Sequence, residues 1–456
     1  MSKSSQLKLF SPAEEAAGYL NSQHGGFFSI LANVNGTKRQ TSHRLNQLPK
    51  ILELVKPEQD TWITQAEFFR PNRRVVNLAS IGQLFADLDC YNMAWAKGRS
   101  PEQLASCARF FIEDAGLPPP SVIVFSGRGL QVKWFLTSAL PRQALPRWNA
   151  AQNYLVERLI EAGADRNAKD ASRVLRLVQT VNSKSGEVCR VLDVTKGDDG
   201  EPIRYNFELL CETLLPVSRG VIEEAKNKRA AHGLKLHHGL KTDGLRGFSG
   251  RQLAWDRLDD LRTLAGLRGG VAENEKTVHL FWRLNFLLLS GATNHKLMYA
   301  EAAVLAREIN PSWRYRSKEL MTLYDKAKKH AAGEKVEFNG RQITPLYTPK
   351  NDRLINLFGI TDDEQRQLKT IISTDIARER HSKREKERRR ANGAVDRETY
   401  LEAANTKQER AMELREQGMT QKQIAEEMGV GLRSVKRYLS EGAKSVRITN
   451  GEAYAL

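Results

Sequence analysis

Residues 84–91 read LFADLDCY and place two aspartates, Asp87 and Asp89, in an otherwise apolar run. A short apolar run of this kind is typical of a buried strand. Side chains alternate between the two faces of a strand, so residues two apart project from the same side. Two carboxylates there are costly without a partner, and we therefore expect a cation beside them. A divalent metal ion is the sharper interpretation, and aspartates that cap a turn at the strand end are the alternative.

The composition indicates a globular protein that binds a polyanion. Of the 456 residues, 40% are hydrophobic and 27% are charged, the formal net charge is +17, and the pI is about 9.7. This basic balance favours nucleic acid as the partner. We expect no membrane span and no signal peptide, because the apolar runs are too short. The four cysteines form no CxxC pair, so we expect a cytoplasmic protein without disulfides or structural zinc.

A β-hairpin is predicted next. The runs VIVF (122–125) and LQVKWFL (130–136) are separated by the turn SGRG, which is the pattern of two paired strands. Gln131 and Lys133 share one face of the second strand, and such a face suits a nucleotide site better than a hydrophobic core. The glycines of the turn would let backbone N–H groups approach a phosphate closely. A simple tight hairpin would also explain them.

A third group of charged residues follows a predicted amphipathic helix. It begins with Asp165 and continues with Asp170, Arg173 and Arg176. If the segment is helical, the two arginines share a face, and paired guanidinium groups match phosphate geometry. A surface ion-pair network is the alternative. Combined with the first aspartate pair, the pattern suits nucleotidyl transfer, in which carboxylates hold divalent ions and cations hold a triphosphate.

The segments LFADLDCY, SGRGLQVKW and GADRNAKDASRVLRLVQTVNSKSG resemble, in this order, the motifs of the archaeo-eukaryotic primase superfamily. Within it the chain resembles the replication proteins of bacterial plasmids, phages and integrative elements. The resemblance covers about residues 60–215. It implies an RRM-like catalytic domain that synthesises primers from nucleoside triphosphates on single-stranded DNA, with Mg²⁺ or Mn²⁺ as the cofactor.

The resemblance also implies which residues carry this activity. The catalytic, metal-binding acids are Asp87, Asp89 and Asp165, with Asp170 as the alternative third ligand. The nucleotide-binding residues are Ser126, Gly127, Gly129 and Gln131, and Arg173, Arg176 and Asn182 contact the triphosphate or the template. Lys133 joins this group through the strand-face argument above. The sequence departs from the family pattern at Gln131, where many members have His, and at Val178-Gln179, where Pro-Gly is usual.

The C-terminal region carries a helix-turn-helix pattern. Thr420 and Gln423 form a capping box, and two apolar helix faces follow on either side of a glycine-containing turn, as in DNA-binding modules of this type. A small helical bundle that mediates dimerisation is the alternative. The residues expected to contact DNA are Arg433, Ser434, Lys436 and Arg437.

We therefore expect an α+β fold class: an RRM-like catalytic domain followed by an all-α domain and a C-terminal helix-turn-helix. A long helix is expected over 361–392, and its basic end is either a solvated face or a phosphate contact. The expected parts are a catalytic domain at 1–218, a linker at 219–250, a helical domain at 251–350, a basic helix and connector at 351–404, the helix-turn-helix at 405–445, and a tail at 446–456.

The function expected from these parts is that of a replication primase of a mobile element, a nucleotidyltransferase that uses NTPs or dNTPs. The partners would be a single-stranded template and duplex origin DNA. Because the chain has no GxxxxGK[ST] phosphate loop, a separate replicative helicase would open the duplex. The alternative is a non-catalytic replication initiator or transcriptional regulator. A nuclease or integrase fits less well, because the triphosphate-binding residues would be idle.

Overall fold

The computed structural model describes residues 10–20, 25–215, 243–338, 340–393 and 397–440. The chain divides into two compact units, Met1–Ile372 and Ser373–Leu456, which are described separately. No helix among the described residues is long and apolar enough to cross a bilayer.

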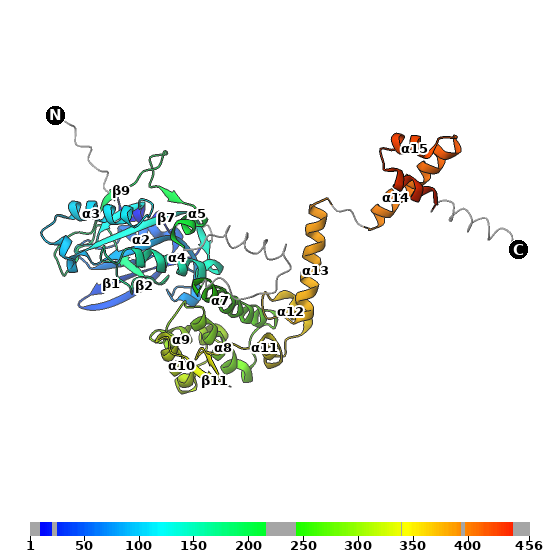
Figure 1. Cartoon of the computed structure of the whole chain (residues 1–456). Coiled ribbons are helices and arrows are strands. Elements are labelled where there is room, and N and C mark those ends of the chain that lie inside the picture. The colour runs from blue at the N-terminus through cyan, green and yellow to red at the C-terminus, as the bar shows by residue number, and fades with distance from the viewer. Residues whose placement is uncertain (1–9, 21–24, 216–242, 339, 394–396, 441–456) are drawn as a thin grey trace, which may run out of the picture. The chain divides into compact units, whose positions relative to one another are not determined.

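The first unit contains a ten-stranded sheet (Figure 1). Its main path is β8-β3-β1-β4-β5-β7-β6-β9, with β2 paired to β1 and β10 paired to β7. The pairs along this path are antiparallel, and β10 runs parallel to β7. The predicted α+β fold class is confirmed. The strands are β1 (Phe27–Val34), β2 (Thr37–Arg44), β3 (Thr61–Thr64), β4 (Glu67–Phe68), β5 (Leu78–Leu88), β6 (Val122–Phe125), β7 (Leu130–Pro141), β8 (Val174–Arg176), β9 (Arg190–Val194) and β10 (Arg204–Tyr205).

Helices cover both faces of this sheet because its strands carry apolar side chains on alternate sides. Trp134 of β7 belongs to one buried cluster, and the next residue, Phe135, belongs to another. Full burial of one such side chain contributes about 1.5–3 kcal/mol to stability. Helices α3 (Pro101–Asp114), α4 (Leu145–Arg158) and α5 (Phe207–Leu214) contribute to the first cluster, and α1 (Pro12–Ala17) and α2 (Leu48–Glu53) contribute to the second.

The predicted helical region follows the sheet in the chain, and its first helix shares a hydrophobic cluster with α4. One hydrophobic cluster contains both Trp148 of α4 and Trp255 of α7. The expected linker lies outside the described residues up to 242, and its last residues already belong to α7. The elements of this region are α7 (Asp243–Leu267), α8 (Lys276–Leu289), α9 (Met298–Ile309), α10 (Met321–Ala331), β11 (Val336–Phe338), β12 (Arg341–Ile343), α11 (Asn351–Phe358) and α12 (Asp362–Gln367).

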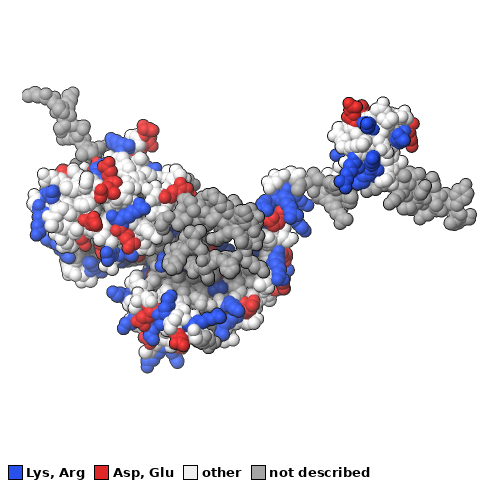
Figure 2. Space-filling view, in the orientation of Figure 1, with Lys and Arg blue, Asp and Glu red and all other residues white. Residues whose placement is uncertain are grey.

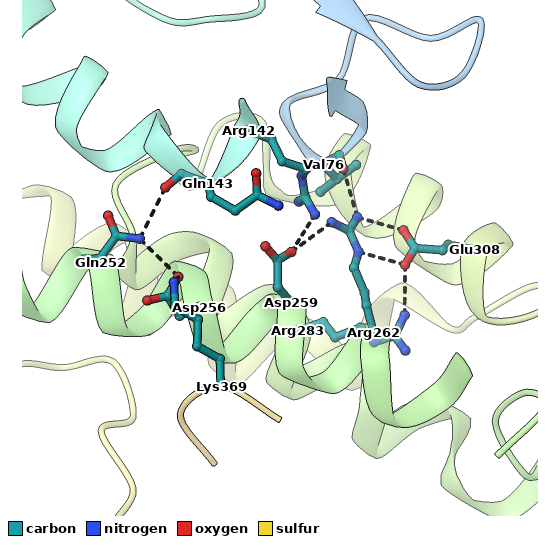
Figure 3. A network of polar contacts seen from close by, with 10 residues as sticks. All are labelled: Val76, Arg142, Gln143, Gln252, Asp256, Asp259, Arg262, Arg283, Glu308 and Lys369. Carbon is teal, nitrogen blue, oxygen red and sulfur yellow. Dashed lines mark hydrogen bonds and ion pairs between the residues drawn. The ribbon is translucent and has the colours of Figure 1, made fainter. Parts of the chain in front are cut away.

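A polar network fixes α7 against the sheet (Figure 3). Arg142, at the end of β7, forms an ion pair with Asp259 of α7. From the same helix, Arg262 donates hydrogen bonds of 2.8 Å to the carbonyl oxygen of Val76 and to Glu308 of α9. These contacts hold α7 and α9 in a defined position beside the start of β5 and the end of β7.

The long helix expected over 361–392 is wrong, because the structure has two shorter helices there. Helix α12 ends at Gln367, and α13 (Thr374–Ala391) begins only after a non-helical link. The carboxylate of Asp260 accepts hydrogen bonds of 2.7–2.8 Å from the three successive backbone N–H groups of residues 369–371. A buried acceptor of this strength stabilises a non-helical link instead of a helical turn.

The second unit contains α13, α14 (Arg397–Glu416), α15 (Gln421–Glu427) and a helix over 432–440. The predicted capping box of Thr420 and Gln423 is present. Ile424 and Val435 are fully buried and face each other in one small core, as predicted. Lys and Arg crowd the exposed surface of α13 (Figure 2).

Candidate nucleotide site

An open pocket of about 160 Å³ lies where the ends of β3, β5, β7 and β8 meet. We call it the acid pocket. It collects side chains from all three motifs singled out in the sequence, although these are separated by up to about a hundred residues. Six of its lining residues were predicted: Asp87, Asp89, Ser126, Gln131, Arg176 and Asn182. The others are Trp62, Tyr91, Arg128, Val174, Leu175 and Lys184.

The register between β5 and β7 places the first two motifs together. Asp87 lies directly opposite Gln131 in this antiparallel pair, where side chains of opposed residues are neighbours. Asp89 lies one residue beyond the end of β5, at the start of a short 3₁₀ helix. The two aspartates therefore line the same pocket, but only Asp87 projects from the strand itself.

Asp87 and Asp89 repel each other, and the charges of Arg173 and Lys133 offset this repulsion only in part. Burial, followed by the charges of Asp89 and Asp165, raises the pKa of Asp87 to about 7. Among the described residues, no lysine or arginine forms an ion pair with Asp87 or Asp89. Such an arrangement would be relieved by a bound cation.

Asp165 is held beside this pair by the backbone. Its N–H donates a hydrogen bond of 2.8 Å to the carbonyl oxygen of Asp87, and the N–H of Asp89 donates one of 2.9 Å to that of Gly163. The Asp165 carboxylate accepts a hydrogen bond of 2.8 Å from the backbone of Asn167. No group of three or more Asp, Glu, His or Cys side chains within the described ranges is arranged to hold a metal ion. Metal binding therefore stays a prediction.

Asp170, the alternative third ligand, lies in a different environment. Its carboxylate accepts a 2.6 Å hydrogen bond from the Ser172 hydroxyl and pairs with Arg173 at 3.1 Å. It lines a second pocket and not the acid pocket. Asp165 does not line the acid pocket either, but its backbone hydrogen bond to Asp87 places it nearer to the aspartate pair.

The expected common face of Arg173 and Arg176 is wrong, because the segment forms strand β8 and not a helix. Arg176 lines the acid pocket, while Arg173 lines the second pocket. Arg176 pairs with Asp60 at 2.5 Å and stacks over the Trp62 ring at 4.7 Å. Burial opposes ionisation of Asp60, but hydrogen bonds from Ser183 and Arg176 lower its pKa to about 2. Arg176 is therefore firmly positioned.

Lys133 does not belong to the nucleotide site. Its side chain is completely buried, pairs with Glu15 of α1 at 2.5 Å, and lies 4.7 Å from the centre of the Tyr19 ring. Lys133 shares a strand face with Gln131, but α1 covers that face beyond Gln131. A side chain enclosed in this way cannot reach a ligand, and this assignment is corrected.

The glycine turn packs closely against its neighbours. Gly127 has φ +89°, and a Cβ there would lie 2.5 Å from Asn182. A Cβ on Gly129 would lie 2.2 Å from the carbonyl oxygen of Leu88, next to the aspartate pair. Asn182 donates a 2.9 Å hydrogen bond to the Ser126 carbonyl. Within the described part of the chain, no residue accepts a hydrogen bond from the N–H of Gly127 or Arg128.

Several lining residues were missed by the sequence reasoning. The Arg128 guanidinium lies 3.9 Å from the centre of the Tyr91 ring, which is 43% exposed. Both residues sit inside quoted motifs, so their proximity to the acids could have been found. Lys184 also lies inside a quoted motif. Trp62 carries no such signal, because the pairing of β3 with β8 brings it to the pocket.

The helix over 432–440 presents the residues predicted to contact DNA. Arg433, Lys436 and Arg437 are exposed, and Ser434 is half-buried. Val435 points into the small core instead. A family model described as the helix-turn-helix domain of resolvase matches residues 399–442.

Comparisons found one similar replication protein and several similar solved structures. The chain is 28% identical over 326 residues to a replication protein of Clostridium perfringens, covering 71% of each chain. It is also similar to the AEP domain of the cyanophage S-2L primase-polymerase, at 19% identity and TM-score 0.31, covering 41% of this chain and 89% of that one. The catalytic domain of primase RepB' in complex with initiator DNA matches at 13% identity and TM-score 0.28, covering 50% and 100%. The replication protein is of a kind that the resemblance in the sequence predicted.

Proposed function

We propose that the chain is a replication primase, a nucleotidyltransferase that extends a strand on a DNA template from NTPs or dNTPs. One observation carries this proposal. The acid pocket brings a partly neutralised aspartate pair together with a glycine turn and a fixed guanidinium. This combination suits a triphosphate and the cation that accompanies it.

The carboxylates of Asp87 and Asp89 are oxygen donors of the type that Mg²⁺ and Mn²⁺ prefer, and their partly uncompensated charge fits such an ion. Asp165 is the third acid of this proposed cluster. A bound divalent ion would stabilise the charge that develops on the transferring phosphate and its leaving group.

The remaining residues would bind and orient the nucleotide. The free N–H groups of Gly127 and Arg128 offer hydrogen bonds to phosphate oxygens. Arg176 and Lys184, which also line the pocket, add positive charge. The Trp62 and Tyr91 rings provide flat apolar surfaces against which a base can stack. Gln131, directly opposite Asp87, offers an amide to the nucleotide.

The second unit supplies the proposed contact with duplex DNA. Its helix-turn-helix would bind through Arg433, Ser434, Lys436 and Arg437, bringing the protein to an origin. A non-catalytic initiator or regulator is the competing function, since the family match at 399–442 is compatible with either. A separate helicase remains part of the proposal.

Primer synthesis separates the two functions. The wild-type protein is incubated with single-stranded template, labelled triphosphates and Mg²⁺ or Mn²⁺, next to Asp87→Ala/Asp89→Ala. The matched control is Asp198→Ala/Asp199→Ala, which removes two acids from an exposed turn. We expect product from wild type and control, and at least about a 100-fold loss in the pocket variant. If none of the three proteins makes product while all of them still bind duplex DNA, the primase proposal is wrong and the non-catalytic function is favoured.

A further inference from the structure

A second pocket, of about 270 Å³, adjoins the acid pocket, and Val174 lines both. We call it the arginine pocket. It lies between the sheet and the start of α9, which contributes Leu297. Its other lining residues are Arg73, Arg74, Asp170, Ser172 and Arg173. The function proposed for the acid pocket makes no use of it.

Positive charge dominates the arginine pocket. Three guanidinium groups line the pocket with one carboxylate, that of Asp170, which pairs with Arg173 at 3.1 Å. The buried carboxylate of Glu301, outside the lining, also interacts with the charge of Arg74. Arg73 is held in place by hydrogen bonds of 2.8 Å to Gln40 and to the Ser172 carbonyl. Burial and the charge of Arg74 lower the pKa of Arg73. Guanidinium groups held this close together repel one another, and a bound anion would relieve this repulsion.

Two of these guanidinium groups have unused donors. Among the described residues, Arg74 forms neither an ion pair nor a side-chain hydrogen bond. Arg173 donates to the Asn167 carbonyl, but its Nε is buried and has no hydrogen-bond partner. A buried donor left unpaired costs about 1–3 kcal/mol, so a ligand oxygen at this position would be favoured.

We propose that the arginine pocket binds a phosphate group next to the nucleotide held in the acid pocket. Guanidinium groups match the oxygens of a phosphate in fork-like pairs. The phosphate would come from the backbone of the DNA strand or from a second nucleoside triphosphate. The inference rests on the proposed function, because it takes the acid pocket as the nucleotide site.

Binding measurements without metal ions test this inference separately from catalysis. The full chain carrying Arg74→Gln is compared with Arg341→Gln, which removes an exposed arginine from β12 that lines neither pocket. Fluorescence anisotropy in EDTA measures the affinity for a labelled oligo-dT strand and for a labelled triphosphate over a series of salt concentrations. A third variant, Arg74→Lys, retains the positive charge. If it binds as wild type does, the effect of Arg74→Gln is not due to misfolding.

If a strand phosphate occupies the pocket, Arg74→Gln weakens strand binding by about 3- to 10-fold and lowers the salt slope by about 0.7, the value for one phosphate contact on a single strand. If a triphosphate occupies it, the same variant weakens triphosphate binding instead. Arg74→Lys should retain most of the affinity. Equal affinities and equal salt slopes for Arg74→Gln and Arg341→Gln with both ligands would overturn the proposal.

A chemical footprint locates the phosphate independently of the other basic surfaces. Phenylglyoxal modifies accessible guanidinium groups, and mass spectrometry of the digested protein reads each arginine. The bound strand or triphosphate should protect Arg74 several-fold while Arg341 stays reactive. Equal modification of Arg74 with and without both ligands would overturn the proposal even if primer synthesis is observed.

Discussion

Replacing Asp87 by Asn should stabilise the metal-free protein above neutral pH while removing the proposed activity. Burial and the charges of Asp89 and Asp165 raise the pKa of Asp87 from 3.8 to about 7. A carboxyl group with a raised pKa binds its proton more tightly in the folded state. Its contribution to stability is therefore full below about pH 4 and is lost as the pH rises through about 7. This difference corresponds to about 4 kcal/mol at most.

The assay is urea unfolding in EDTA at pH 4, 6 and 8, followed by tryptophan fluorescence. All seven tryptophans lie in Met1–Ile372, so the signal reports on the unit that contains the site. Asp87→Asn should match wild type near pH 4 and exceed its free energy of unfolding by up to about 4 kcal/mol at pH 8. Asp198→Asn, in an exposed turn, should change little. The electrostatic reasoning would be refuted if Asp87→Asn raised the free energy of unfolding by the same amount at every pH, or lowered it at pH 8.

Three further predictions concern specific residues. Lys133→Met should cost about 3–5 kcal/mol of unfolding free energy, because it leaves Glu15 buried and unpaired; adding Glu15→Gln should recover most of this in urea unfolding. Gly129→Ala should abolish triphosphate binding in a fluorescence titration, since its Cβ would meet a carbonyl oxygen at 2.2 Å, whereas Gly266→Ala, in open space within α7, should not. Replacing the exposed lysine and arginine residues of 432–440 with glutamine should lower the salt slope of duplex binding by about 0.9 for each phosphate that the protein no longer neutralises. An unchanged slope would contradict DNA binding by this helix.

The local elements could be predicted because their signals are local. The apolar run around Asp87 forms β5, the glycine turn joins β6 to β7, and the capping box at Thr420 opens α15. The helix-turn-helix core was also predictable, because helical periodicity alone brings Ile424 and Val435 to facing sides. Each of these features depends on residues close together in the sequence.

The site as a whole depends on pairings that periodicity does not encode. Strand alternation correctly put Gln131 and Lys133 on one face, yet the position of α1 decides that one lines the pocket and the other is buried with Glu15. The pairing of β3 with β8 brings Trp62 to the pocket, and no sequence motif marks it.

Long-range polar contacts also explain the misplaced helix. Charge and apolar spacing favour one continuous helix over 361–392, but Asp260, about a hundred residues earlier, binds the backbone N–H groups of 369–371. A capping interaction between distant segments overrides the local preference.

Template-directed incorporation tests the central proposal most directly. The wild-type chain is given an oligo-dT template, labelled ATP or dATP as the only triphosphate, and Mg²⁺ or Mn²⁺. The proposal predicts adenine-containing products that require the template and disappear with Asp87→Ala/Asp89→Ala. Products that form equally without template, or at the same rate in the double variant, would contradict it.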